Sequence, residues 1–252
     1  MITILLSKQG IILGDGVTIK IKVIVYKRSR YKIDTKNTFL AVVHIKNIAT
    51  MNIKRQLPDW ENRYQQVELD LLPWFYPDLD PDIEQALADL SIQTGKVLDL
   101  GSGPGTQAIA LAKAGFEVIA TDVSITAIKK ASQTLPDTQL PVTFQQDDIL
   151  QSKLEENFDL IIDRGVFHVF SEQQRAAYLD SIEKLIKPRG YLLLKTFSYL
   201  ETSDEGPHRF TAEQICQLFT DHFNVISIVD SCFIGPEGQA PKALFCIMQR
   251  TD

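Results

Sequence analysis

Three glycines at alternate positions separate a predicted strand from a predicted helix near the middle of the chain. Gly101, Gly103 and Gly105 follow the apolar stretch Lys96–Leu100, and a helix is expected to begin at Thr106. Glycines let a backbone turn tightly and approach a ligand closely, and the free N–H groups at a helix start favour an anionic group. This pattern predicts a site for a nucleotide-like ligand.

An acidic residue stands where the next predicted strand ends. Asp122 comes 21 positions after Gly101 and closes an apolar stretch, and a carboxylate there can accept hydrogen bonds from ribose hydroxyls. The glycine spacing is G-x-G-x-G, so Thr106 occupies the place of the third glycine in the dinucleotide motif G-x-G-x-x-G. The spacing therefore departs from the oxidoreductase pattern.

The chain after Pro58 is predicted to alternate between strands and helices. The strand candidates are Lys96–Leu100, Glu117–Thr121, Val142–Gln145, Phe158–Asp163 and Tyr191–Phe197, and the helix candidates are Trp60–Leu72, Pro81–Leu90, Thr106–Ala114, Ile125–Leu135 and Ser171–Ile186. Strands that are apolar throughout are buried on both faces, and helical crossovers imply parallel pairing.

The last part of the chain lacks a crossover helix between its strands. After a predicted helix at Thr211–Phe219, the strands Phe223–Val229 and Lys242–Gln249 are joined by a loop that contains Gly235 and Gly238. Such a connection favours an antiparallel pair. The predicted fold class is therefore α/β, a doubly wound, mostly parallel seven-stranded sheet with a C-terminal antiparallel hairpin.

The glycine loop and its acidic partner resemble the class I S-adenosylmethionine-dependent methyltransferases. That resemblance implies a Rossmann-like fold, S-adenosylmethionine as cofactor, and methyl transfer to an S, N or O atom of a small-molecule acceptor. It implies that the loop wraps the methionine part, that Asp122 binds the ribose, and that Asp148 or its neighbour Asp147 meets the adenine. The implied cofactor-binding residues are Asp99, Gly101, Ser102, Gly103, Gly105, Thr106, Asp122, Val123, Asp147, Asp148, Ile149, Asp163 and Trp74.

Three ionisable residues, Asp163, Arg164 and His168, follow the predicted strand that ends at Asp163. This segment, together with Trp60–Tyr64 and Gly206–Phe210, resembles the small-molecule methyltransferases of the thiopurine methyltransferase-like and tellurite-resistance-type subgroup. The resemblance covers about residues 58–250. It implies catalytic roles for Asp163, Arg164 and His168, substrate contacts for Trp74, Phe75, His208 and Arg209, and a lid role for Trp74.

Each acceptor-side residue has a structural alternative. Arg164 could be an ion-pair partner of Asp163 or Asp159, and His168 could be a hydrogen-bonded structural histidine. His208 and Arg209 could cap a helix, and Trp74 and Phe75 could be core residues. A thiol acceptor ionises near neutral pH, whereas an alcohol or amine would need a base such as His168 or Asp163.

Charge divides the chain of 252 residues into two unlike parts. Residues 1–50 carry nine Lys and Arg against two Asp, a net charge of +7, whereas residues 51–252 carry −13. The first part is predicted to be β-prone, with strands at Ile2–Leu6 and Val17–Tyr26. It could be a β-rich appendage, a basic contact arm, or residues upstream of the native start at Met51, which is the interpretation that we favour. The methyltransferase domain is expected at residues 51–252.

The remaining composition restricts the partners and the compartment. The acidic charge of the main part favours a small-molecule acceptor over nucleic acid. The three cysteines form no C-x-x-C pair, so no metal site is expected, and no apolar run is long enough for a membrane helix. A cytoplasmic location is expected. A non-catalytic S-adenosylmethionine-binding protein and an NAD-dependent oxidoreductase are the alternatives, while the oligomeric state and the acceptor stay open.

Overall fold

The computed structural model describes residues 59–155, 157–203, 206–235, 238 and 240–252, together with the backbone of two strands at 8–13 and 17–22. The chain divides into two compact units, Met1–Asn52 and Ile53–Asp252. In the first unit, β1 (Lys8–Leu13) pairs antiparallel with β2 (Val17–Lys22). The predicted strand Ile2–Leu6 and the last residues of Val17–Tyr26 lie outside the described residues.

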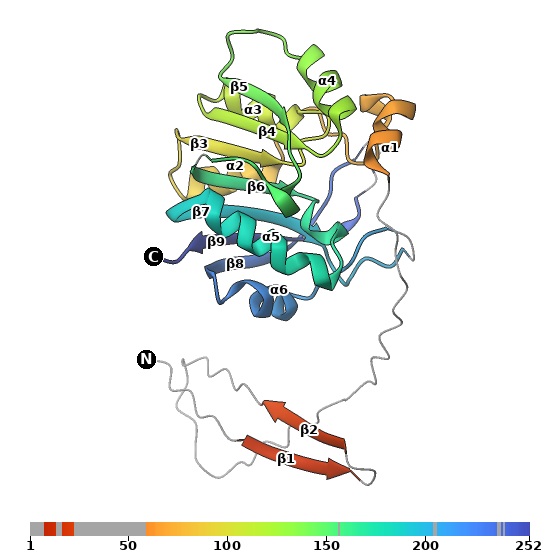
Figure 1. The fold of residues 1–252 in the computed structure, drawn as a ribbon, viewed down its shortest axis with the longest axis vertical. Coiled ribbons are helices and arrows are strands. Elements are labelled where there is room, and N and C mark those ends of the chain that lie inside the picture. Colours follow the sequence, from red (N-terminus) through yellow and green to blue (C-terminus); the bar gives the residue numbers. More distant parts are fainter. Residues whose placement is uncertain are drawn as a thin grey trace. The chain divides into compact units, whose positions relative to one another are not determined.

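A seven-stranded sheet organises the second unit, with the order β5-β4-β3-β6-β7-β9-β8 (Figure 1). The strands are β3 (Lys96–Leu100), β4 (Glu117–Asp122), β5 (Val142–Gln146), β6 (Phe158–Arg164), β7 (Ile186–Phe197), β8 (Phe223–Cys232) and β9 (Lys242–Arg250). Strands β3 to β7 pair in parallel, and β9 runs antiparallel to both β7 and β8. This confirms the predicted mostly parallel sheet with its antiparallel C-terminal hairpin.

Helices cover both faces of this sheet (Figure 1). They are α2 (Pro81–Asp89), α3 (Thr106–Lys113), α4 (Ile125–Gln133), α5 (Glu172–Leu185) and α6 (Ala212–Phe219). Successive side chains of a strand point to opposite faces. Accordingly, Val97 packs in one apolar cluster with α2 and α3, whereas the adjacent Leu98 packs in another with α5 and α6. Burial on both faces explains why the strands are apolar throughout.

The predicted helix Trp60–Leu72 is wrong in its second half. The helix α1 (Trp60–Gln66) ends six residues earlier, and a short 3-10 helix η1 (Leu69–Leu71) follows it. Val67 is extended, with φ −118° and ψ 137°, and its carbonyl accepts a hydrogen bond from Lys130 Nζ at 3.1 Å. Lys130 belongs to α4, so a tertiary contact forms at the point where α1 ends. The local sequence around Val67 does not predict this helix end.

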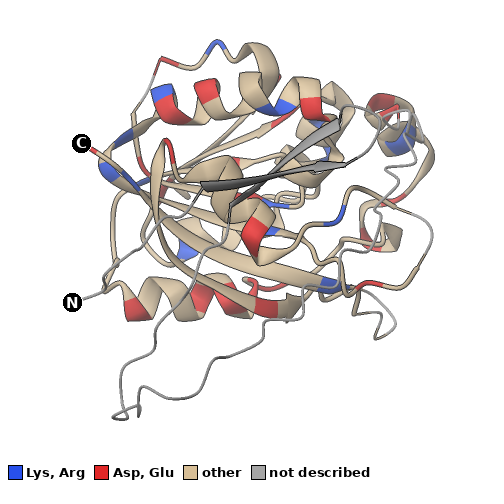
Figure 2. Ribbon diagram, turned by 90° about the horizontal axis from the view of Figure 1, so that it is seen from below, with Lys and Arg blue, Asp and Glu red and all other residues tan. Residues whose placement is uncertain are grey.

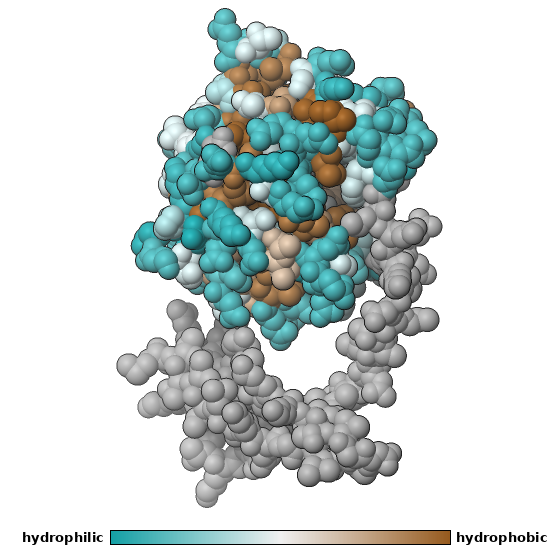
Figure 3. Space-filling view, viewed as in Figure 1, coloured by the Kyte–Doolittle hydropathy of each residue, from teal (hydrophilic) through white to brown (hydrophobic). Residues whose placement is uncertain are grey.

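The surface of the second unit is mixed in both charge and hydropathy. Acidic positions are spread along the helices, and Lys and Arg are scattered singly between them (Figure 2). On the face seen in Figure 3, apolar surface forms small separate patches among hydrophilic side chains. Among the described residues, no helix is long and apolar enough to cross a membrane.

Candidate functional site

The glycine loop between β3 and α3 needs each of its three glycines. Gly101, Gly103 and Gly105 have φ values of +63°, +49° and +77°, in the left-handed region where other residues are strained. A Cβ on Gly103 would lie 2.6 Å from the Tyr64 hydroxyl, and a Cβ on Gly105 would lie 2.7 Å from the ring of Phe144. The loop thus follows a path that only glycine permits.

Asp122, at the end of β4, holds this loop in place. Its carboxylate accepts hydrogen bonds from the backbone N–H of Gly103 at 3.0 Å and of Ser124 at 2.9 Å. The side chain is buried, and burial raises the pKa of Asp122 to about 6. The residue predicted to bind a ribose therefore also joins the glycine loop to the start of α4.

Four buried oxygen atoms at or just after the carboxyl ends of β3, β4 and β5 have no hydrogen-bond partner in the described part of the chain. They are Asp99 Oδ2, Ser102 Oγ, Thr121 Oγ1 and Asp147 Oδ2. Burial also raises the pKa of Asp99 to about 7. Buried polar atoms are usually paired, so partnerless oxygens at this edge of the sheet fit a ligand that donates hydrogen bonds and carries positive charge.

The two neighbouring aspartates after β5 differ in their bonding. Asp148 Oδ1 accepts the backbone N–H of Leu150 at 3.0 Å and so begins a 3-10 helix, η2 (Ile149–Gln151). Asp147 Oδ1 accepts the backbone N–H of Lys153 at 3.0 Å, while its other oxygen is one of the four without a partner. Ile149 is buried in the core, whereas Val123 is 47% exposed beside Asp122.

Helix α1 and the segment that leads to Trp74 lie against the glycine loop. The Tyr64 and Trp74 side chains lie nearest to the point where a Cβ on Gly103 would stand, and the Trp60 and Trp74 rings meet edge to face at 5.7 Å. Glu61 fastens this segment to the start of α4, because its carboxylate accepts hydrogen bonds from Thr126 and, at 2.7 Å, from Ser124 Oγ. These hydrogen bonds lower the pKa of Glu61 to about 2. We call residues 60–74 the cover segment.

The Asp163 carboxylate is hydrogen-bonded to the turn that follows β6. One oxygen accepts hydrogen bonds from the N–H groups of Gly165 and Val166, at 3.1 and 2.7 Å. The other oxygen accepts hydrogen bonds from the Phe167 N–H at 2.9 Å and from the Tyr178 hydroxyl at 2.7 Å. Burial raises the pKa of Asp163 to about 6. Its oxygens therefore organise backbone around the site and face four protein donors.

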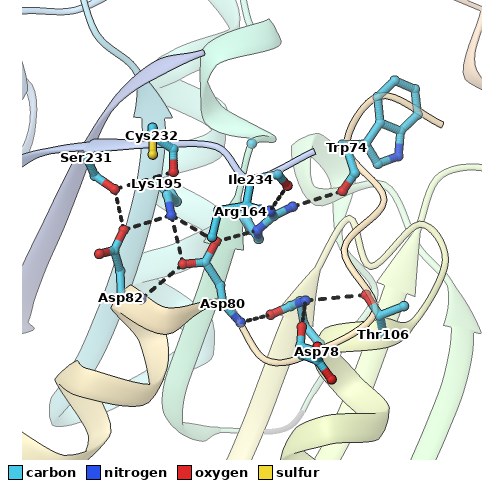
Figure 4. Close-up of polar contacts among 12 residues, drawn as sticks. Trp74, Asp78, Asp80, Asp82, Thr106, Arg164, Lys195, Ser231, Cys232 and Ile234 are labelled. Carbon is cyan, nitrogen blue, oxygen red and sulfur yellow. Dashed lines mark hydrogen bonds and ion pairs between the residues drawn. The ribbon is translucent and has the colours of Figure 1, made fainter. Parts of the chain in front are cut away.

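Arg164 pairs with Asp80, and with neither Asp163 nor Asp159 (Figure 4). Its Nε donates to Asp80 Oδ2 at 2.7 Å, and its two terminal nitrogens donate to the carbonyls of Trp74 and Ile234, at 3.0 and 3.1 Å. The side chain is thus directed toward the cover segment and the loop after β8. Asp159 instead pairs with Lys187 at 2.7 Å.

Lys195 also belongs to this buried network. The sequence pattern did not identify it as a candidate site residue. Its Nζ lies 2.7 Å from both Asp80 Oδ1 and Asp82 Oδ2, and Asp82 also accepts a hydrogen bond from Ser231 (Figure 4). Burial opposes ionisation of Asp80, but the charges of Lys195 and Arg164 outweigh it and lower the pKa of Asp80. A lysine inside the apolar strand Tyr191–Phe197 was the available signal.

Of the other predicted acceptor residues, His208 lies beside His168. The backbone N–H of His208 donates to the His168 carbonyl at 2.9 Å, and Arg209 donates to the Ser203 carbonyl. His168 is buried, and its Nδ1 accepts the Phe197 N–H at 3.1 Å. Phe75 packs instead against the small apolar cluster formed by Tyr64, Leu72 and Ala127. The structure therefore brings His168 and His208 together and places Phe75 elsewhere.

One open pocket among the described residues lies beside the glycine loop and shares Thr106 with it. It has a volume of about 760 Å³ and lies between η1, α3 and α4, where its walls include Asp70, Phe75, Thr106, Lys113 and Lys130. Thr106, whose hydroxyl accepts a hydrogen bond from Gln107 at 3.3 Å, borders both the pocket and the glycine loop. Asp99, Asp122 and Asp163 do not line it. The candidate site is therefore identified by its buried polar groups and not by this pocket.

Solved structures share this fold. A structure described as the conversion of a disulfide bond into a thioacetal group during echinomycin biosynthesis superposes with a TM-score of 0.65, at 24% identity over 76% of this chain and 90% of that one. TehB from Haemophilus influenzae superposes with a TM-score of 0.57, at 20% identity over 69% of this chain and 63% of that one. The fold is the Rossmann-like fold of S-adenosylmethionine-dependent methyltransferases.

Sequence comparison gives the family. Residues 93–235 match the model of a methyltransferase domain, and the chain belongs to this family. It is 29% identical to "Probable thiol methyltransferase 2" of Arabidopsis thaliana, over 70% of this chain and 79% of that protein. It is also 29% identical to "Thiocyanate methyltransferase 1" of Brassica oleracea, over 58% of this chain and 64% of that protein. The protein is therefore a methyltransferase, which removes the oxidoreductase alternative.

Proposed function

We propose that the chain binds S-adenosylmethionine at the glycine loop and methylates a sulfur atom or a related soft anion of a small molecule. The observation that carries the cofactor assignment is the group of partnerless buried oxygens at the carboxyl ends of β3, β4 and β5, together with the Asp122 carboxylate that contacts the glycine loop. Bound S-adenosylmethionine supplies a methyl group on a positively charged sulfur, so the group to be transferred is already activated.

The residues of the chain would hold this cofactor through hydrogen bonds and close approach. Asp99 and Ser102 offer oxygens for an ammonium group, and Asp122 has remaining lone pairs for ribose hydroxyls. Asp147 or Asp148 would accept from the adenine amino group. The cover segment would exclude water, because Tyr64 and Trp74 already lie against Gly103.

The acceptor class follows from the bonding of the candidate bases. Asp163 faces four donors, and His168 Nδ1 is occupied by a backbone N–H. An acceptor that ionises by itself, such as a thiol, would need neither residue as a base. The names of the thiol and thiocyanate methyltransferase relatives agree with this choice.

A labelled-methyl assay tests the proposal. The purified full chain would be incubated with S-adenosylmethionine labelled in its methyl group and with hydrosulfide, thiocyanate, a small thiol, a phenol or an amine. We expect labelled product from the sulfur acceptors and little from the phenol or the amine. Binding of the cofactor without transfer to any acceptor would show that the sulfur assignment is wrong. Absence of cofactor binding would contradict the proposal as a whole.

A further inference from the structure

His168 lies at the carboxyl end of the sheet, in a position that the cofactor site does not explain. It belongs to the 3-10 helix η3 (Phe167–Val169), which follows β6 after a turn at Gly165 and Val166, and it is 6% exposed. Its ring packs against Phe197, at the end of β7, with centroids 4.7 Å apart, and against Phe233, after β8, at 5.7 Å. The imidazole thus packs against aromatic rings at the ends of β7 and β8.

The hydrogen bond at Nδ1 fixes the position of the imidazole proton. A backbone N–H can only donate, so the Phe197 N–H at 3.1 Å requires a lone pair on Nδ1. In a neutral imidazole the proton then resides on Nε2. Burial, with a smaller contribution from His208, lowers the pKa of His168 to about 3, which keeps the ring neutral near physiological pH. In this form Nε2 donates and has no lone pair with which to take a proton.

The donating edge of the ring faces the turn at the end of β6. Nε2 and Cε1 each lie 3.4 Å from the point where a Cβ on Gly165 would stand, and Gly165 has a φ of +104°. Acceptors of this fold class approach the carboxyl ends of the strands. Besides His208, the ionisable groups at this end of the sheet bind other protein groups: Arg164 and Lys195 both bind Asp80, and Asp163 binds the turn.

We propose that His168 donates its Nε2–H to the acceptor atom that becomes methylated and orients that atom without removing a proton from it. This role rests on the proposed methyl transfer. It adds a restriction on the substrate, because a hydrogen-bond donor at this position favours an acceptor that is already ionised when it binds, such as a thiolate or a pseudohalide. The lone pair of the acceptor forms the new bond to the methyl carbon, the electron pair of the broken carbon–sulfur bond stays on the departing sulfur, and no proton moves.

Two amide substitutions separate the two nitrogens of the ring. In His168→Asn the amide oxygen can replace Nδ1 as acceptor for the Phe197 N–H, whereas in His168→Gln the amide nitrogen can replace Nε2 as donor. With hydrosulfide and thiocyanate as acceptors, we expect His168→Asn to raise the acceptor KM about tenfold or more and His168→Gln to stay near wild type. The KM for S-adenosylmethionine should be unchanged in both variants.

The opposite pattern would overturn the donor role. If His168 acted as a base, His168→Gln would lose most of kcat, because an amide cannot accept a proton at neutral pH. A His168→Asn protein with the wild-type acceptor KM would be equally contradictory. A thermal unfolding curve for each variant shows whether loss of activity comes from loss of the fold.

A second readout does not depend on turnover. The chain has four histidines, so the ¹⁵N resonances of His168 can be identified by comparison with His168→Asn. We expect a neutral ring with its proton on Nε2, and a shift of the Nε2–H signal when thiocyanate is added in the presence of S-adenosylhomocysteine. A proton on Nδ1, or no shift with thiocyanate or hydrosulfide, would refute the assignment. A shift without methylation of any acceptor would instead point to failure of the proposed function.

Discussion

Three buried aspartates at the carboxyl ends of neighbouring strands have different bonding. Asp122 and Asp163 accept backbone N–H groups and hold the loops that follow them, whereas Asp99 keeps one oxygen without a partner. Burial raises the pKa of all three carboxyl groups. Because all three aspartates stand at strand ends, they lie at the same edge of the sheet. The number of backbone N–H groups that each carboxylate already accepts determines how many lone pairs remain for a ligand.

Asp122 should contribute directly to cofactor affinity. We expect Asp122→Ala to weaken binding of S-adenosylmethionine by about 1 to 3 kcal/mol through loss of charge-assisted hydrogen bonds, as measured by calorimetry. Asp159→Ala is a matched control, since Asp159 is a carboxylate at the opposite end of β6 with partners in Lys96 and Lys187. Equal affinity of a folded Asp122→Ala protein and the wild type would show that the ribose assignment is wrong.

Cofactor affinity should depend on pH through Asp99. Its pKa of about 7 means that the free protein holds a proton there in mildly acidic solution. A cationic ligand favours the ionised carboxylate, so binding must release that proton, and affinity should fall as the pH decreases from about 8 to about 6. Calorimetry across this range, with Asp99→Asn for comparison, measures the effect. A wild-type affinity that stays constant over the range would contradict this linkage.

At the scale of elements, the cover segment contains both tryptophans of the chain, Trp60 and Trp74. Tryptophan fluorescence therefore reports on this segment alone. We expect Glu61→Ala to increase quenching by acrylamide and to raise the dissociation constant of S-adenosylmethionine, because Glu61 loses its bonds to Ser124 and Thr126. Glu68→Ala is the matched control, since Glu68 is largely exposed and lies 3.9 Å from Lys130. Identical quenching in the two variants would argue against a fastening role for Glu61.

The network around Asp80 joins α2, β6 and β7 through buried charges. Removing one partner of such a group leaves the others uncompensated, so Asp80→Asn should lower the free energy of unfolding by about 3 kcal/mol or more. Breaking the half-exposed pair of Asp159 and Lys187 by Asp159→Asn should cost about 1 kcal/mol or less. Urea denaturation compares the two variants, and a similar loss in both would contradict the importance of burial here.

The sequence predicted the elements that depend on local pattern. Apolar strands and the G-x-G-x-G spacing located β3, β4 and the glycine loop, because burial on both faces and left-handed backbone angles restrict the residues that fit. It did not predict that Arg164 and Lys195 would meet at Asp80, since these residues are 84 and 115 positions away from it. It also placed the end of α1 too late, where a contact with α4 accompanies the change in backbone direction.

For the whole molecule, the proposed methyltransferase domain begins near the point where the charge pattern changes. The unit Ile53–Asp252 contains the seven-stranded sheet and every candidate site residue. We therefore expect a chain that starts at Met51 to unfold at the same temperature as the full chain and to bind S-adenosylmethionine equally well. Mass spectrometry of the native protein tests whether translation starts at Met51. An intact species beginning at Met1 would contradict our interpretation of residues 1–50.

The most direct test of the whole account is a calorimetric titration of the full chain with S-adenosylmethionine, paired with the same titration of Asp122→Ala. The account predicts one saturable site in the wild type, weaker binding in the variant, and no comparable heat with NAD. No binding of S-adenosylmethionine by the folded wild-type protein, or tighter binding of NAD, would contradict it.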